Sequence, residues 1–236
     1  MGAMILLGTS YPLLAHVAAL SARADLIAAS IGLLVVLVLL PALRIGRLLA
    51  WAALLGAAFG LYGVAASGKA LSLLLLPPVL LNGFMAWVFG RTLRDGRMPL
   101  IERAARAMRG PGAVLGDEVV AYARGVTQVW TGLFVVLAVV NLVLAALARP
   151  GGLLLAAGLD PAVSVPLSTW SMFANLLSYL FIAALFAIEF VVRGRRFPQQ
   201  PYSGLVDFTR RLAAQAHMFR PTAVDPAPRR DPVQRD

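Results

Sequence analysis

The sequence predicts an all-α fold, a polytopic bundle of about six transmembrane helices. Of its 236 residues, 60% are hydrophobic and only 14% are charged, whereas soluble domains carry about 25% charged residues. A helix needs roughly 20 apolar residues to cross about 30 Å of hydrocarbon, and six stretches approach that length. This composition excludes an ordinary soluble enzyme, and the lack of cysteine excludes a disulfide scaffold.

The predicted spans belong to one transmembrane domain over residues 1–198, followed by a cytosolic tail, residues 199–236, that is partly disordered. The first span is short and broken by Tyr11 and Pro12. A signal peptide is the alternative, but no basic residue precedes the apolar run as such a signal requires. The spans are predicted near residues 4–20, 26–43, 48–66, 71–90, 126–148 and 169–192.

The basic residues orient these spans. If both termini are cytosolic, 18 of the 21 arginines and lysines lie on the inner side, and Arg23, Lys69 and Arg149 lie outside. This asymmetry agrees with the positive-inside rule. The net charge of +10 therefore indicates membrane orientation, and we do not expect nucleic acid as a partner.

The longest connection between spans, residues 91–124, contains a predicted amphipathic helix that lies on the inner leaflet. A second surface helix is predicted in the tail near residues 205–218. The arginines of the first helix either anchor it to anionic lipid or dock an acidic partner. Its apolar side consists of Ile101, Ala104, Ala105 and Met108, and its basic side of Arg103, Arg106 and Arg109.

Several polar side chains fall within the spans, where charge is costly and often functional. Glu189 shares one face of the sixth span with Ser171, Asn175 and Ser178, at about 100° per residue. One interpretation is interhelical hydrogen bonding, which also suits Asn82 and Asn141. The other is a cleft at the inner face for an anionic headgroup or a partner. That cleft would contain Arg91, Arg94, Arg124, Glu189 and Arg193.

Gly56 and Gly60 form a GxxxG motif in the third span. Small residues at this spacing let two helices approach closely. We expect the neighbour to be another helix of this chain, and a second protein is the alternative.

The sequence contains no recognisable catalytic, cofactor-binding or metal-binding motif. The two histidines are far apart in the chain, and Glu189 has no acidic neighbour, whereas acid-base catalysis usually needs such a partner. We therefore expect no cofactor, and an enzyme is disfavoured but not excluded. Two alternatives stay open, a lipid-handling transporter or channel component and a membrane-embedded transferase that uses Glu189.

Three segments carry a resemblance to a known family. They are residues 82–110 with FGRTL and PLI, residues 122–130 with YxR, and residues 170–198 with RRFP. Over most of residues 1–198 the chain resembles an uncharacterised family of small bacterial inner-membrane proteins. Members occur in gene clusters for aryl-polyene or xanthomonadin-type pigment lipids, beside acyl carrier proteins, ketosynthases, acyltransferases and an exporter. The tail after residue 200 looks additional to the family pattern.

The resemblance implies a multi-pass protein of the bacterial inner membrane and supplies no mechanism. Its context suggests membrane lipids, an acyl carrier protein, or membrane biosynthetic and export proteins as partners. Acyl carrier proteins are acidic, so a basic cytosolic surface could dock one. The leading hypothesis is an accessory protein that organises lipid or polyene biosynthesis or export at the membrane.

Overall fold

The computed structural model describes residues 2–21, 23–66, 70–110 and 114–198, and these are mostly helical. The helical fold class is thus confirmed. Contacts divide the chain into two compact units. Unit 1 comprises Met1–Asn82 and Val136–Ala183, and unit 2 comprises Gly83–Val135 and Ala184–Asp236. The surface helix predicted near residues 205–218 lies outside the described residues.

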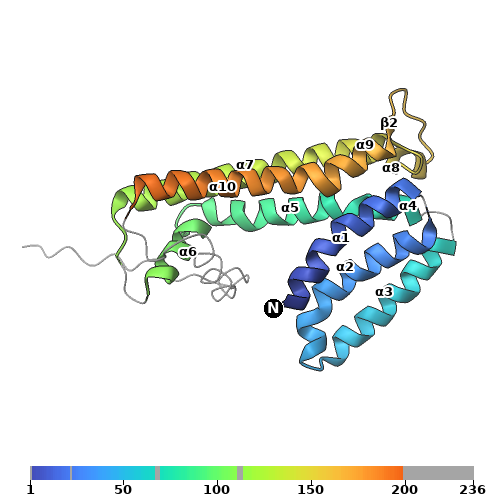
Figure 1. The fold of residues 1–236 in the computed structure, drawn as a ribbon, viewed down its shortest axis with the longest axis horizontal. Coiled ribbons are helices and arrows are strands. Elements are labelled where there is room, and N and C mark those ends of the chain that lie inside the picture. Colours follow the sequence, from blue (N-terminus) through green and yellow to red (C-terminus); the bar gives the residue numbers. More distant parts are fainter. Residues whose placement is uncertain (1, 22, 67–69, 111–113, 199–236) are drawn as a thin grey trace, which may run out of the picture. The chain divides into compact units, whose positions relative to one another are not determined.

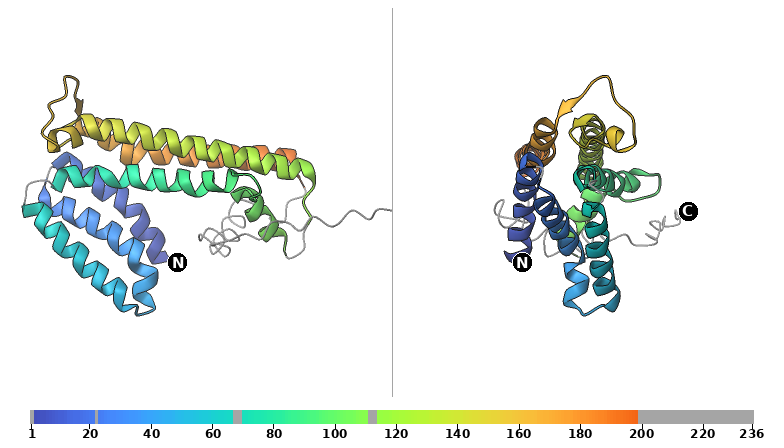
Figure 2. Two further views of the ribbon diagram at one scale, coloured as in Figure 1. Left: turned by 180° about the vertical axis from the view of Figure 1, so that it is seen from behind. Right: turned by 90° about the vertical axis from the view of Figure 1, so that its right-hand side faces the viewer.

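Unit 1 begins with three consecutive helices at the positions of the first three predicted spans. They are α1 (Gly2–Ser21), α2 (Ala24–Arg44) and α3 (Leu48–Ala66). Each runs antiparallel to the one before it, and α2 contacts both neighbours (Figures 1 and 2). Gly46 has a φ of 69° in the turn between α2 and α3, a conformation that costs glycine little.

The fourth predicted span is also helical, with one irregular residue inside it. It consists of α4 (Ala70–Leu74), α5 (Leu76–Gly90) and the 3-10 helix η1 (Arg91–Leu93). The break at Leu75 comes just before Pro77 and Pro78, which lack the backbone N–H groups of a regular helix. The Pro77-Pro78 pair thus stands in the first turn of α5, where proline is tolerated.

The connection to the fifth span forms the predicted helix, α6 (Leu100–Arg109), which ends at Gly110 with a φ of 98°. The next helix, α7 (Asp117–Leu147), begins at the two acidic residues expected to start it. Acidic side chains stabilise a helix start because they face its positive dipole end. Both boundaries therefore follow from local sequence.

The sixth span contains a wide turn that the sequence did not reveal. It runs through α9 (Leu167–Met172), the π-helix η2 (Phe173–Leu177) and α10 (Ser178–Arg196). A short segment precedes it, with β1 (Ala148–Arg149), α8 (Leu153–Ala156) and β2 (Val165–Pro166). The two strands pair in parallel, Ala148 beside Val165, and Arg149 forms an ion pair with Asp160.

Three helical stretches among the described residues are long and apolar enough to cross a membrane. They are Leu71–Leu93, Asp117–Leu147 and Leu167–Arg196. Two shorter apolar helices, Asp25–Leu40 and Leu48–Gly63, lie at the second and third predicted spans. The number of six spans and the orientation of the chain stay predictions.

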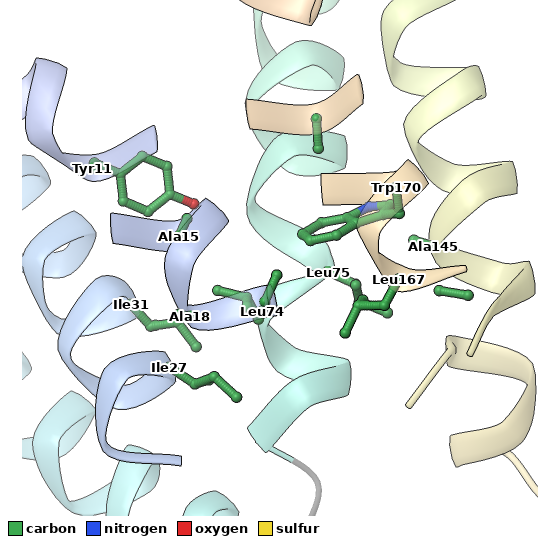
Figure 3. Close-up of a cluster of buried hydrophobic side chains, with 13 residues drawn as sticks. Tyr11, Ala15, Ala18, Ile27, Ile31, Leu74, Leu75, Ala145, Leu167 and Trp170 are labelled. Atoms are coloured by element: carbon green, nitrogen blue, oxygen red, sulfur yellow. The ribbon is translucent and has the colours of Figure 1, made fainter. Parts of the chain in front are cut away.

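The core of unit 1 lies where α1, α2, α4 and α9 meet (Figure 3). Trp170 of α9 is fully buried there, and Ala15 and Ala18 of α1 are at most 1% exposed. Small residues let helices pack closely in a membrane, where the hydrophobic effect does not drive association. The alanines of α1 thus allow it to approach α9, with which it is in contact.

Candidate functional site

Unit 1 holds a buried hydrogen-bonded link between α1 and α9. The Nδ1 atom of His16 lies 2.9 Å from the Oγ atom of Ser171, and Asn175 Nδ2 donates to the same hydroxyl at 3.2 Å. Ser171 is fully buried and Asn175 is 2% exposed. The sequence placed Ser171 and Asn175 on one face but overlooked His16. The available signal was an ionisable side chain inside an apolar helix, which is a functional candidate by default.

A second link joins α7 to α10. Asn141 Nδ2 donates to Leu137 O at 2.8 Å and to Ser178 Oγ at 3.3 Å. The Ser178 hydroxyl in turn donates to the carbonyl of Phe173 at 2.9 Å, five residues earlier, across the π-helical turn. Both side chains are buried. Such links are the interhelical hydrogen bonds of the first interpretation.

Asn82 takes no part in these links. Its Nδ2 atom donates to Pro78 O at 2.7 Å within α5. The side chain is 6% exposed, so this bond satisfies a buried donor on its own helix. The predicted polar stripe is therefore divided. Bonds between helices are made by Asn141, Ser171 and Ser178, whereas Asn175 bonds within its own span and Asn82 within α5.

Three buried polar atoms of unit 1 have no hydrogen-bond partner among the described residues. They are Tyr11 Oη, Trp170 Nε1 and Asn141 Oδ1. Most buried polar groups are paired, and an unpaired one costs about 1–3 kcal/mol. At these three atoms, the hydrogen-bonding capacity of buried side chains in unit 1 is not met by the described residues.

Unit 2 contains a groove of about 660 Å³, counting the part that is open to the surroundings. One wall is the apolar side of α6, from Ile101 to Met108. The other walls are the first turns of α7, with Val119 and Tyr122, and the end of α10. Most lining side chains are apolar, and the exceptions are Arg109, Tyr122, Glu189 and Arg193.

The acidic residue of this groove is paired. Arg193 Nε lies 3.2 Å from Glu189 Oε1, one helical turn away, and the two side chains are 14% and 10% exposed. Oppositely charged side chains four residues apart lie on the same face of a helix and can pair in this way. Tyr122 stands at the same end of the groove, with its ring 5.3 Å from that of Phe197.

The other arginines of the predicted headgroup cleft do not line this groove. Arg91 lies over the ring of Trp87 at 4.6 Å, and Arg124 Nη2 donates to Leu93 O at 3.0 Å. Arg94 is exposed. The residues expected in one cleft thus have separate environments, and among them only Glu189 and Arg193 form an ion pair.

Two hydrogen bonds connect the start of α6 to η1 and α7. Thr92 Oγ1 accepts the N–H of Leu100 at 3.1 Å, and Thr127 Oγ1 accepts that of Ile101 at 3.4 Å. These bonds satisfy two amides that a helix start leaves unpaired. The surface-helix interpretation stays a prediction, and among the described residues the side expected to enter lipid lines this open groove.

A buried acid of α6 escaped the sequence analysis. Glu102 is 5% exposed, and its Oε1 atom accepts from Arg106 Nη2 at 2.8 Å. Arg106 had been assigned to the basic docking side. Arg106 is thus already paired with an acidic residue of its own helix. Arg109, by contrast, forms no ion pair with the residues that the structure describes.

The GxxxG motif of α3 faces open space. A methyl group added at Gly56 or Gly60 would meet no atom within 4 Å. Within the described part of the chain, no helix packs against this motif. The choice between a partner inside the chain and a second protein therefore stays open.

Among the residues that the structure describes, no three His, Asp or Glu side chains gather as metal ligands would. Comparisons of the chain with protein-family models, curated proteins and solved structures find no match. The family resemblance and its functional context therefore stay expectations.

Proposed function

We propose that the chain is an accessory protein of the bacterial inner membrane that holds lipid- or polyene-synthesis machinery at the cytosolic surface. The partner we favour is an acyl carrier protein or another acidic protein of such machinery. Both termini and the connection that contains α6 would then be cytosolic, as the distribution of basic residues predicts.

The orientation of α6 carries this proposal. An interfacial helix holds a membrane by burying its apolar side in lipid, and the apolar side of α6 lines the groove of unit 2. The apolar area that α6 could bury in lipid is therefore reduced, and with it the free energy of anchoring to the membrane. Basic side chains stay outward before and at the end of the helix, since Arg94, Arg97 and Arg109 are exposed. A surface of this charge attracts an acidic protein.

The membrane transferase gains no support from the groove. Glu189 is paired with Arg193, and neither a second carboxylate nor a histidine lines the groove within the described residues. Acid-base catalysis needs a proton-accepting side chain within hydrogen-bond reach of the substrate. The lipid-handling alternative is favoured by one observation, the apolar groove itself.

The test measures binding of a purified acyl carrier protein to the full chain in nanodiscs of neutral phosphatidylcholine. The variant Arg94→Glu/Arg97→Glu reverses two exposed charges outside the groove. We expect it to weaken binding at least about tenfold, because like charges now face each other. Added salt should weaken binding to the original chain as well.

The matched control is Arg44→Glu/Arg47→Glu, which changes net charge equally at the exposed end of α2 and its turn. It should leave the affinity unchanged. Equal losses in both variants would show that only net charge matters, and absence of binding by the original chain would end the proposal.

A further inference from the structure

Unit 2 has a second groove, between α7 and α10, with a volume of about 640 Å³ counting the part that is open to the surroundings. We call it the α7–α10 groove. Four residues of each helix line it, from Tyr122 to Val129 on α7 and from Leu185 to Val192 on α10. Seven steps of 1.5 Å along either helix give a length of about 10 Å. This is most of the thickness of one leaflet's hydrocarbon, which is about 15 Å.

The α7–α10 groove is separate from the groove beside α6. Ala123 lines only the groove beside α6, and Gly125 lines only the α7–α10 groove. Two positions along a helix differ by about 200° in direction, so these residues lie on nearly opposite sides of α7. Tyr122 and Glu189 line both grooves and stand between them. Arg109 lines only the groove beside α6, so any charge at the end of the α7–α10 groove comes from other residues.

Arg196 lies at one end of the α7–α10 groove. It comes four residues after Val192, and residues at this spacing lie on the same face of a helix. The Cζ atom of Arg196 is 5.8 Å from the centre of the Tyr122 ring, over its face. Arg196 is exposed and forms no ion pair with the residues that the structure describes. Its guanidinium is therefore available to an anionic group at this end of the groove.

The other charges near this end are balanced. Glu189 is paired with Arg193, at 3.2 Å. Glu118 lies four residues before Tyr122 on the groove side of α7 and offsets the charge of Arg196. A ligand with a net negative charge therefore gains little from this end as a whole. A single phosphate next to Arg196 still gains a charge-assisted hydrogen bond, so a phosphate within a neutral head group fits best.

The length of α10 places Arg196 at the level of lipid head groups. The stretch Leu167–Arg196 has 30 residues and is apolar enough to cross a membrane. It is about 45 Å long, whereas the hydrocarbon core is about 30 Å thick. An arginine at the end of such a helix extends to the head groups. The apolar lining from Val192 to Leu185 then lies beside the acyl chains.

We propose that the α7–α10 groove binds a membrane glycerophospholipid, with its phosphate at Arg196 and one acyl chain between α7 and α10. A transmembrane helix is a poorer occupant, because membrane helices pack closely through small residues. Gly125 is the one small residue among those that line the groove. The acyl chain is flexible and needs no such surface. This site does not depend on the docking of a carrier protein.

Gly125 offers a direct way to fill the groove. A methyl group added there would meet nothing within 4 Å, and leucine favours helix more than glycine does. Gly125→Leu therefore occupies the space of the acyl chain without displacing protein neighbours. Gly83 of α5 is equally open and also half-buried, and it lines neither groove. Gly83→Leu is thus the matched control.

Arg196→Gln tests the phosphate site, and Arg195→Gln is its matched control. Both arginines are exposed and lie in the last turn of α10, so the two variants lose the same charge. Arg195 is rotated by about 100° from Arg196, away from the ring of Tyr122. A phosphate held by Arg196 therefore distinguishes the two variants, whereas a general attraction by net charge does not.

The experiment uses the full chain in dodecyl maltoside micelles that contain a phosphatidylcholine with a diazirine in one acyl chain. The lipid must replace detergent in the groove, so the extent of labelling follows its affinity. Ultraviolet light attaches the probe covalently, and mass spectrometry locates it. We expect attachment in residues 122–129 and 185–192. Gly125→Leu should reduce it at least about fivefold because the space is filled, and Gly83→Leu should not.

The head group is tested with the arginine variants and a second probe. Arg196→Gln should reduce labelling by phosphatidylcholine about threefold, the effect of an exposed ion pair, and Arg195→Gln should not. A diacylglycerol with the same acyl chains lacks the phosphate. It should label less than phosphatidylcholine and be indifferent to Arg196→Gln.

Three equalities would each overturn the proposal. They are equal labelling in the two glycine variants, equal labelling in the two arginine variants, and equal labelling by phosphatidylcholine and diacylglycerol. Absence of labelling at these residues in the original chain would overturn it as well. A partner helix, a second copy of the chain or the chain's own residues 199–236 would then occupy the groove and exclude the lipid.

The outcomes are independent of those for the docking surface. Arg94→Glu/Arg97→Glu lies outside the α7–α10 groove and should leave phospholipid labelling unchanged. Loss of carrier binding with intact labelling, or the reverse, would show which of the two proposals fails.

Discussion

Asn141 provides the sharpest test of how the polar side chains of unit 1 act. Its Nδ2 atom makes the cross-helix bond to Ser178 at 3.3 Å, and its Oδ1 atom is buried without a partner among the described residues. Asn141→Leu removes both features and keeps the number and branching of the side-chain heavy atoms. The free energy of unfolding of this variant therefore reflects the loss of one hydrogen bond between helices and the removal of one unsatisfied carbonyl oxygen.

The two contributions nearly cancel. Hydrogen bonds between membrane helices contribute about 0.6 kcal/mol on average and at most about 1.7 kcal/mol. An unsatisfied buried polar group costs about 1–3 kcal/mol. We therefore expect Asn141→Leu to change the free energy of unfolding by less than about 1.5 kcal/mol. Asn141→Ala leaves a cavity in addition and should be the less stable variant.

The assay is reversible unfolding in mixed micelles, followed by tryptophan fluorescence. A double-mutant cycle with Ser178→Ala isolates the bond between the two side chains, and its coupling energy should be about 0.6 kcal/mol. A loss above about 3 kcal/mol in Asn141→Leu would refute the reasoning. It would mean that the carbonyl has a strong partner, such as a bound water or ligand, and that the structural interpretation of the asparagines is wrong.

Two other predictions concern local packing and orientation. Gly152→Ala should lower the free energy of unfolding by about 3 kcal/mol or more, because its methyl group would clash with the carbonyl oxygen of Ala148. Gly158→Ala, at a φ of 82° in open space, should lower it by only about 1–2 kcal/mol. Because the chain has no cysteine, Arg97→Cys and Val163→Cys give unique labels. An impermeant maleimide should modify the cysteine at position 163 in intact spheroplasts and the one at position 97 only after lysis, and the reverse pattern would invert the orientation.

The helices and several of their ends could be predicted from the sequence alone. Apolar length locates a helix in each predicted span because the signal is contained within one segment. The same holds for the end of α6 at Gly110 and for the acidic start of α7. These features depend on residues a few positions apart, so no tertiary contact is needed to infer them.

The partners of the polar and charged side chains were decided by the tertiary structure. The π-helical turn at Phe173–Leu177 changes the rotation per residue, so a uniform 100° cannot relate Ser171 to Glu189. His16 lies within hydrogen-bond distance of Ser171, which is 155 residues later in the sequence. Helical periodicity relates only residues of one helix, so it could not predict this contact. The apolar side of α6 likewise fits lipid or protein equally well by pattern, because hydrophobicity has no direction or preferred partner. Local periodicity shows that a side is apolar, and only the packing of the helices shows what covers it.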